Sequence, residues 1–318
     1  THARSSHSGG PDMPEPFAPH FTVTPLMQRQ LKAIDQARGF LEAVRLQGPW
    51  LDALRSERRV KDALSSVQIE GNSLTYEQAF ALAQTPPDRD LRDSECEFLN
   101  YLRAFEAIDG LSGQRDIRLS RADLLNLHRI LVDGVRGGQR FGGQLRREQV
   151  SVGDRVDGEV IVHRQPPVWG EVEALVDDLF GWIDTVKQHP SRAKVLKGAD
   201  DPWLHPVLVA GIAQHRLAWV HPFVDGNGRT ARMLSTLLLY QRGYDFKGLF
   251  DLSSYYERNR DHYYEALRTV DRSDDYTQWL VYFMGGLSLQ MFSIMAVAAK
   301  HATGVAAPEV ELGGGEEG

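Results

Sequence analysis

Twelve residues in the C-terminal half of the chain, His221–Arg232, read HPFVDGNGRTAR. Pro222 disfavours helical backbone at His221, so the apolar segment before it is expected to end there. A new apolar stripe then begins at helical spacing, with Leu234, Leu237 and Leu238. The stretch therefore predicts a helix, a tight glycine loop and the N-terminus of a second helix.

Such a loop is suited to binding an anion. Gly226 and Gly228 permit positive φ and the close approach of a ligand to the backbone. Their N–H groups and the positive end of the following helix dipole together favour a phosphate group. Arg229 and Arg232 are three positions apart and share a helix face, from which guanidinium groups can bind phosphate oxygens.

Two further side chains of the stretch have chemistry that suits phosphate transfer. Asp225 offers a carboxylate oxygen, a ligand that Mg²⁺ prefers beside phosphates. His221 has an ordinary pKa near ~6.5, which suits a general base. Twelve residues therefore contain a candidate base, a candidate metal ligand, an anion-binding loop and two arginines.

Other interpretations of the same residues were weighed. A Gly-Asn-Gly run is commonly only a turn, and two arginines on a helix are commonly solvated. The loop is not a Walker A motif, because the lysine and its glycine spacing are missing. His215 and His221 lack a third ligand at zinc spacing.

The composition of the whole chain is typical of an ordinary globular protein. It has 318 residues, a formal net charge of -7 and one cysteine, Cys96. The charge disfavours nucleic acid as a partner, and a single cysteine excludes an internal disulfide. With no secretory signal and no apolar run judged long enough to span a bilayer, we expect no membrane and a cytoplasmic location.

Helical spacing dominates the sequence. A polar lead over 1–20 precedes an N-terminal helical region over 21–87, which a Gln84–Asp88 break separates from a main domain over 88–300. A Gly- and Glu-rich tail over 301–318 is expected to be disordered. Predicted helices begin at Thr24-Pro25 and run over 49–70, 94–108, 121–135, 169–186, 203–220, 228–242, 254–270 and 275–299. Valines at 150, 152, 160 and 162 flank a turn over 154–158 and predict a small β-hairpin.

The His221–Arg232 stretch resembles the signature HPFxxGNGRxxR of the Fic family, with every fixed position matched. The resemblance extends over about Ser94 to Ala299. It includes Glu97, Asn100 and Tyr101 in an early helix, Gly142 to Gly153 with its flap hairpin, and Asn259-Arg260 with Tyr263-Tyr264 after the signature. It implies the mainly helical Fic fold with a small β-hairpin flap.

The resemblance also implies a reaction, the transfer of AMP from ATP to a Ser, Thr or Tyr hydroxyl of a target protein. His221 would take the hydroxyl proton, and Asp225 would hold Mg²⁺ between the α- and β-phosphates. The remaining implied nucleotide contacts are Gly226, Asn227 and Gly228 at the α-phosphate, Arg229 at the β-phosphate, Arg232 at the γ-phosphate, Asn259 and Tyr264 on the adenine side, and Thr230 and Val150. The target would dock on the flap, and a homodimer is consistent with the family.

A second motif lies upstream. Glu70 ends a predicted helix, where its charge opposes the helix dipole, and Gly71 is the natural residue after that end. Ser66, Glu70 and Gly71 match the family's inhibitory motif [S/T]xxxE[G/N]. The resemblance implies that Glu70 pairs with Arg232, prevents productive binding of the γ-phosphate and so autoinhibits the enzyme.

Alternatives to AMP transfer remain at this point. The protein could remove AMP from a target or transfer another nucleotide. A regulator that senses nucleotide without catalysis is a second class, which an intact His221 disfavours. A DNA-binding regulator is a third class, which the acidic tail disfavours.

Overall fold

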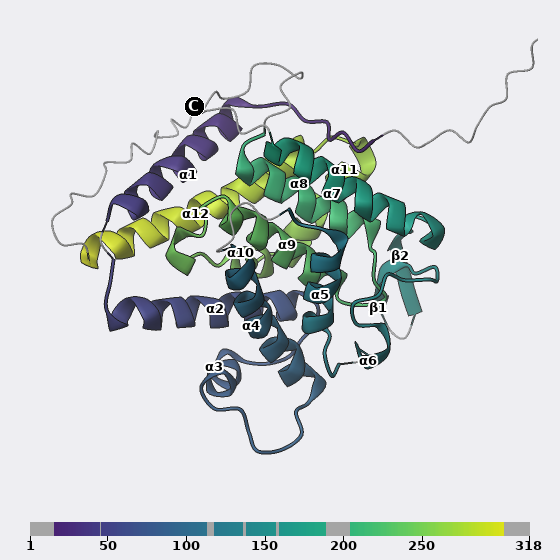
Figure 1. Ribbon diagram of the computed structural model, residues 1–318, viewed down its shortest axis with the longest axis horizontal. Coiled ribbons are helices and arrows are strands. Elements are labelled where there is room, and N and C mark those ends of the chain that lie inside the picture. The colour runs from purple at the N-terminus through teal and green to yellow at the C-terminus, as the bar shows by residue number, and fades with distance from the viewer. Residues whose placement is uncertain are drawn as a thin grey trace, which may run out of the picture.

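The computed structural model describes residues 16–44, 46–112, 118–135, 138–156, 159–188 and 204–301. In this described part the chain folds into helices around one core, with one β-hairpin at one side (Figure 1). The elements are α1 Pro25–Ala43, α2 Pro49–Ile69, α3 Tyr76–Gln84, α4 Asp93–Ser112, α5 Arg121–Leu131, α6 Gly138–Phe141, β1 Val152–Val156, β2 Glu159–Arg164, α7 Val172–Gln188, α8 Pro206–Val220, α9 Asn227–Gln241, α10 Leu252–Glu257, α11 Arg260–Ser273 and α12 Thr277–His301, with 3-10 turns at Trp169–Glu171 and Phe246–Gly248.

Several predicted helix ends have the expected local chemistry. The Thr24 hydroxyl accepts a hydrogen bond from the Met27 N–H at 3.2 Å and caps α1, with Pro25 in the first turn. Helix α2 stops at Glu70, and Gly71 follows with a φ of +91°. That value lies in the region where glycine has no steric penalty, so the predicted C-terminal signal is confirmed.

Other predictions of secondary structure were wrong or incomplete. The single helix predicted over 254–270 is two helices, because the Asn259 side chain accepts a bond from the His262 N–H and starts α11. Helix α3 was missed, although Thr75 and Gln78 form a capping box at its start. The predicted turn over 154–158 is too long, since β1 continues to Val156.

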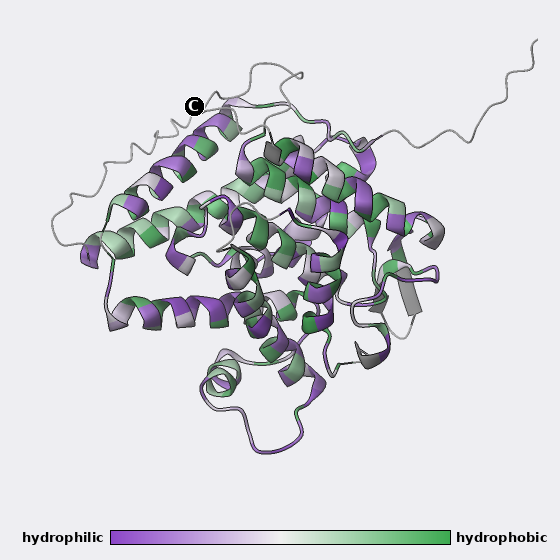
Figure 2. Ribbon diagram, in the orientation of Figure 1, coloured by the Kyte–Doolittle hydropathy of each residue, from purple (hydrophilic) through white to green (hydrophobic). Residues whose placement is uncertain are grey.

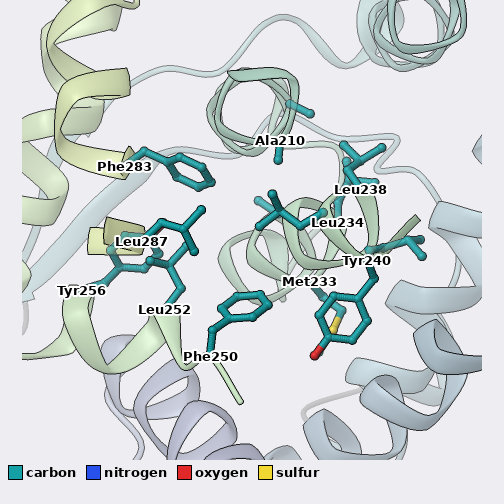
Figure 3. Close-up of a cluster of buried hydrophobic side chains, with 14 of the residues drawn as sticks. Ala210, Met233, Leu234, Leu238, Tyr240, Phe250, Leu252, Tyr256, Phe283 and Leu287 are labelled. Atoms are coloured by element: carbon teal, nitrogen blue, oxygen red, sulfur yellow. The ribbon is translucent and has the colours of Figure 1, made fainter. Parts of the chain in front are cut away.

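Helices α8 and α9 form the centre of the fold (Figure 1), and the His221–Arg232 stretch makes up the loop between them and the first residues of α9. Their apolar residues pack with α10 and α12 in one buried cluster, which Figure 3 shows with Ala210, Leu234, Tyr256 and Phe283 among its members. Helix α8 is apolar on all sides, as expected for a helix surrounded by others. The connecting loop is therefore fixed at both ends by core packing.

Helix α12 corrects one expectation about membranes. By length and composition it could cross a bilayer, but 61% of its apolar window is buried inside the fold. Gly211 of α8 allows this packing, because a Cβ there would lie 3.0 Å from the Phe283 ring. The Trp279 indole N–H also donates to the Gly211 carbonyl at 2.7 Å. The apolarity of α12 is therefore explained by its place in the core, where Figure 2 shows it mostly pale to green.

The segment before α1 packs against the helical part of the protein. The Phe17 N–H donates to the Asp178 carboxylate of α7 at 2.9 Å, and His20 forms a parallel bridge with Asp275. These residues belong to the stretch predicted as a flexible lead, so its last part is placed against the protein. Residues 1–15 and 302–318 lie outside the described residues.

Candidate active site

The loop between α8 and α9 has an unusual conformation that its own side chains maintain. His221 has φ 51° and ψ 59°, a left-handed conformation that ends α8 immediately before Pro222. The Asn227 amide spans the loop, accepting from the Phe223 N–H and donating to the Phe223 carbonyl, both at 2.9 Å. The Thr230 hydroxyl donates to the Gly226 carbonyl at 2.7 Å. Asn227 and Thr230 are buried, so their side chains hold the loop rather than face a ligand.

A cavity of about 780 Å³ opens in front of this loop. Its lining includes His221, Gly228 and Arg232, together with Glu70, the residue that follows α2. The hairpin segments contribute 151–153 and 163–165 to the lining, and α11 contributes further residues. Since the volume is within the range of small-molecule sites, a nucleotide can be accommodated.

His221 lies in this cavity in the protonation state that a base requires. Its Nδ1 is 3.3 Å from the Ala218 carbonyl. A carbonyl only accepts, so Nδ1 carries the proton and Nε2 keeps the lone pair. Burial, together with the positive charge of Arg164, lowers the pKa of His221 to about 4. The imidazole is therefore neutral at pH 7.

Glu70 and Arg232 form the ion pair that the sequence predicts, with 2.8 Å between Glu70 Oε1 and Arg232 Nη2. Arg232 also donates from Nε to the Ser66 hydroxyl and from Nη2 to the Ser66 carbonyl, each at 2.8 Å. Burial lowers the pKa of Arg232, but the Glu70 charge and nearby tyrosines outweigh this and raise it. Three contacts thus direct the guanidinium toward α2.

Glu70 also lies over the N-terminus of α9. A Cβ built on Gly228 would come within 2.2 Å of Glu70 Oε1, so the carboxylate approaches the backbone where any side chain would block it. No side chain caps the helix at Gly226, which is its N-cap residue. The carboxylate therefore occupies the place where the helix dipole and Arg232 would attract a phosphate.

Arg229 is placed differently from Arg232. It is 1% exposed, with Nη1 3.5 Å from Glu97 Oε1 and Nη2 3.4 Å from Asp225 Oδ1. Its Nε and Nη1 are buried without a hydrogen bond. Arg229 is not among the residues that line the cavity. In this conformation its guanidinium faces Glu97 and Asp225, so the expected contact with the β-phosphate stays a prediction.

Comparison with known proteins agrees with this geometry. Residues 118–239 match the model of the Fic/DOC family. The fold is also similar to that of a Fic family protein from Desulfovibrio desulfuricans, with a TM-score of 0.70, 23% identity, and coverage of 90% of this chain and 78% of that chain. Over residues 118–239 the chain is therefore similar to Fic domains.

Proteins named Fic are also similar to this chain over more residues than the family model matches. The chain is 32% identical over 224 residues to the proteins named protein adenylyltransferase Fic from Drosophila erecta and Drosophila melanogaster. That alignment covers 70% of this chain and 40% of each relative, so the chain matches less than half of their length. Fic-1 from C. elegans, as residues 134–508, superposes with a TM-score of 0.65 at 20% identity over 87% of this chain and 74% of that chain.

Three side chains that support the loop between α8 and α9 were not predicted from the sequence: Arg146 and His128 are buried, and Arg164 is 18% exposed. Arg146 donates to the His221 carbonyl at 2.8 Å, and Arg164 donates to the carbonyls of Trp219 and Ala218 at 2.7 and 2.9 Å. His128 stacks on Phe223 with 3.6 Å between ring centroids. The arginines bind carbonyls distant in sequence, so no local spacing reveals them.

His128 supports the loop from below. Its Nδ1 accepts from the Gly143 N–H at 3.0 Å, so Nε2 carries the proton and donates to the Asp225 carbonyl at 3.0 Å. Burial lowers the pKa of His128 to about 4. In the sequence, His128 was only a lone histidine on an apolar helix face among Leu124, Leu127 and Leu131.

Asp225 has the chemistry for Mg²⁺. Its Oδ1 accepts from the Gly226 N–H at 2.6 Å, while the side chain is 46% exposed. Among the described residues, no group of three histidines, cysteines or carboxylates can hold a metal. One carboxylate with nucleotide phosphates is a usual Mg²⁺ arrangement, so Asp225 fits the ion only together with its nucleotide.

The residues predicted to contact the nucleotide on the adenine side occupy different places in the structure. Tyr264 lines the cavity, and its hydroxyl donates to the Ile69 carbonyl at 3.3 Å, beside the end of α2. The Asn259 side chain instead caps α11 and is outside the cavity lining. Val150 is also outside that lining, which begins at the neighbouring Ser151. These positions leave the predicted roles of Asn259 and Val150 in nucleotide binding as expectations.

Proposed function

We propose that this chain transfers AMP from ATP to a hydroxyl group of a target protein. The observation that carries the proposal is the arrangement of His221, Gly228 and Arg232 in one cavity, with the imidazole in its neutral Nδ1–H form. The adenylyltransferase names of the Drosophila relatives support the same reaction. A ligand-sensing protein without catalysis has no need for a neutral base at this place.

In the proposed reaction, His221 Nε2 accepts the proton of the target hydroxyl. The hydroxyl oxygen then attacks the α-phosphorus of ATP in line, and the bond to the pyrophosphate oxygen breaks. Backbone N–H groups at the start of α9 stabilise charge on the α-phosphate. Mg²⁺ bound by Asp225 would neutralise charge on the α- and β-phosphates when present.

The target segment is proposed to bind at the hairpin. Ser151, Val152 and Gly153 line the cavity, and Val152 and Gly153 are the first two residues of β1. An extended segment could pair with the backbone there and present its hydroxyl to His221 with little demand on sequence. A homodimer is a separate proposal that size measurements in solution would decide.

We further propose that Glu70 inhibits the reaction. The Glu70 carboxylate is bonded to Arg232 and lies over Gly228, so a γ-phosphate would meet an anion where it needs a cation. Removing the carboxylate frees Arg232 for that phosphate. Glu70→Gly should therefore raise AMP transfer above the wild-type level.

AMP removal from a modified target is a second candidate, which one observation favours. Glu70 lines the same cavity as His221 and its side chain is 33% exposed, so it could orient a water molecule toward a bound phosphodiester. A target carrying AMP, incubated with wild type and with Glu70→Gly, distinguishes the two reactions. AMP release by wild type alone would assign this second role to Glu70.

A further inference from the structure

Arg164 links the hairpin to the end of α8. It is the last residue of β2, with 18% of its side chain exposed. Its two terminal nitrogens donate to the carbonyls of Trp219 and Ala218 at 2.7 and 2.9 Å. Both carbonyls belong to the last turn of α8, where no helical N–H can reach them. A guanidinium fork is suited to such a pair of acceptors, and its charge is favourable at a helix C-terminus.

The Ala218 carbonyl has a second donor, which is Nδ1 of His221 at 3.3 Å. A carbonyl oxygen has two lone pairs, so it can accept from Arg164 and His221 together. The position of this one oxygen determines which imidazole nitrogen holds the proton and how the ring is oriented. Arg164 therefore contacts the same atom that directs the lone pair of His221 Nε2 into the cavity.

Arg164 is itself held from the other side. Its Nε is 3.5 Å from Asp271 Oδ2 on α11, and Asp271 Oδ1 is 3.3 Å from the buried His215 of α8. The hairpin, α8 and α11 thus meet at the guanidinium. Movement of the hairpin is coupled by these bonds to the residue that ends α8.

We infer that Arg164 is a positioning residue for the base, fixing the Ala218 carbonyl that sets the tautomer and orientation of His221. This inference rests on the proposed AMP transfer for its kinetic test. It also has consequences that are independent of activity, because the tautomer and titration of His221 can be observed directly. Arg164 lies outside the His221–Arg232 signature.

The charge of Arg164 gives a second, separable effect. Three charged groups act on His221: Arg164 from β2, Arg146 from the segment before the hairpin, and Glu70 from α2. Burial is the largest cause of the lowered pKa of His221, and the positive charge of Arg164 is the next largest. The negative charge of Glu70 acts in the opposite direction and raises that pKa. Removing the Arg164 charge should therefore raise the pKa of His221, and a lysine at this position should largely preserve the lowered value.

The test compares Arg164→Gln and Arg164→Lys in the Glu70→Gly chain, with Arg118→Gln as the control. Arg118 is 73% exposed and pairs with Asp184 away from the cavity. A positioned general base contributes roughly 10²–10⁴-fold, so we expect kcat for AMP transfer to fall about 10- to 100-fold in both Arg164 variants. KM for ATP should remain within about twofold, since Arg164 bonds to the protein rather than to phosphate.

The pH profile separates positioning from general damage. The acid limb of kcat/KM should move to higher pH in Arg164→Gln and stay in place in Arg164→Lys. Unchanged kcat and an unchanged limb in Arg164→Gln would overturn the inference. An equal loss in both variants with no movement of either limb would also overturn it, because that is the result of a purely structural role.

Nitrogen NMR of the His221 ring provides a readout that needs neither activity nor a stable variant. In the wild-type chain at pH 7, Nδ1 should be protonated and Nε2 unprotonated. The opposite tautomer would overturn the inference regardless of kinetics. If the Glu70→Gly parent transfers no AMP while the ring shows the expected tautomer, the proposed function fails and the positioning of His221 stands.

Discussion

Replacing Glu70 with glutamine removes one charge from the pair with Arg232 and changes side-chain volume very little. Arg232 is 3% exposed and would keep its two bonds to Ser66. A hydrogen bond between charged groups is worth about 1.5–3 kcal/mol. Because a third of the Glu70 side chain is exposed, we place the loss at about 2 kcal/mol of unfolding free energy.

For a domain of this size, about 2 kcal/mol corresponds to a decrease in Tm of roughly 4–8 °C. Thermal unfolding followed by circular dichroism measures this loss. The matched control is Glu57→Gln, which breaks an exposed pair with Lys61 on the same helix. An exposed pair within a helix is worth about 0.3–0.5 kcal/mol, so the control should shift Tm by roughly 2 °C or less.

With Mg·ATP bound, Glu70→Gln should have a higher Tm than wild type, the reverse of the order without ligand. Ligand at about 100 times its Kd stabilises the folded state by about 2.7 kcal/mol, and Glu70→Gln leaves Arg232 available to the γ-phosphate. We therefore expect ATP to raise the Tm of Glu70→Gln more than that of wild type, while ADP raises both equally. Equal ATP shifts in the two proteins would refute the idea that Glu70 and the γ-phosphate compete for Arg232.

Three other predictions use the same site. Ser66→Ala leaves the buried Arg232 Nε without its acceptor, so it should lower Tm and raise basal AMP transfer, though less than Glu70→Gly; unchanged values of both would contradict the described network. Asp225→Ala should reduce AMP transfer by at least about 100-fold at any Mg²⁺ concentration, and titration with Mg²⁺ that restores wild-type rates would exclude Asp225 as a ligand. His128 and His221 have folded pKa values of about 4, lowered from the ordinary value of 6.5, so the stabilising effect of their neutral forms is complete above pH 6.5 and is lost as pH falls toward 4. Urea unfolding across this range should show each contributing up to ~3 kcal/mol, with a smaller loss in His128→Gln; equal curves for the two proteins would contradict the assignment.

Much of the fold follows from local sequence signals. Thr24-Pro25 and Gly71 mark the start of α1 and the end of α2 by chemistry that acts within a few residues. Pro222 ends α8, and the left-handed His221 is its consequence. The break at Asn259 was missed because a capping asparagine within a continuous apolar pattern resembles any other polar residue on a helix surface.

The candidate site was predicted where its chemistry lies within one motif. His221, Gly228, Arg232 and Glu70 meet in one cavity, as the signature and the upstream motif indicate. Arg146 and Arg164 could not be predicted, since their function here is to donate to backbone carbonyls that only the folded chain brings near them. The bonds of the Asn227 amide to Phe223 were likewise not predicted, and its expected contact with the α-phosphate stays a prediction.

The most direct test of the account is the intact mass of three proteins after incubation with Mg·ATP and a mixture of target proteins. The proteins are wild type, Glu70→Gly and the double variant Glu70→Gly with His221→Ala. The account predicts added AMP on targets or on the chain itself with Glu70→Gly, little with wild type and none with the double variant. Equal AMP transfer by wild type and Glu70→Gly, or transfer that survives the loss of His221, would contradict it.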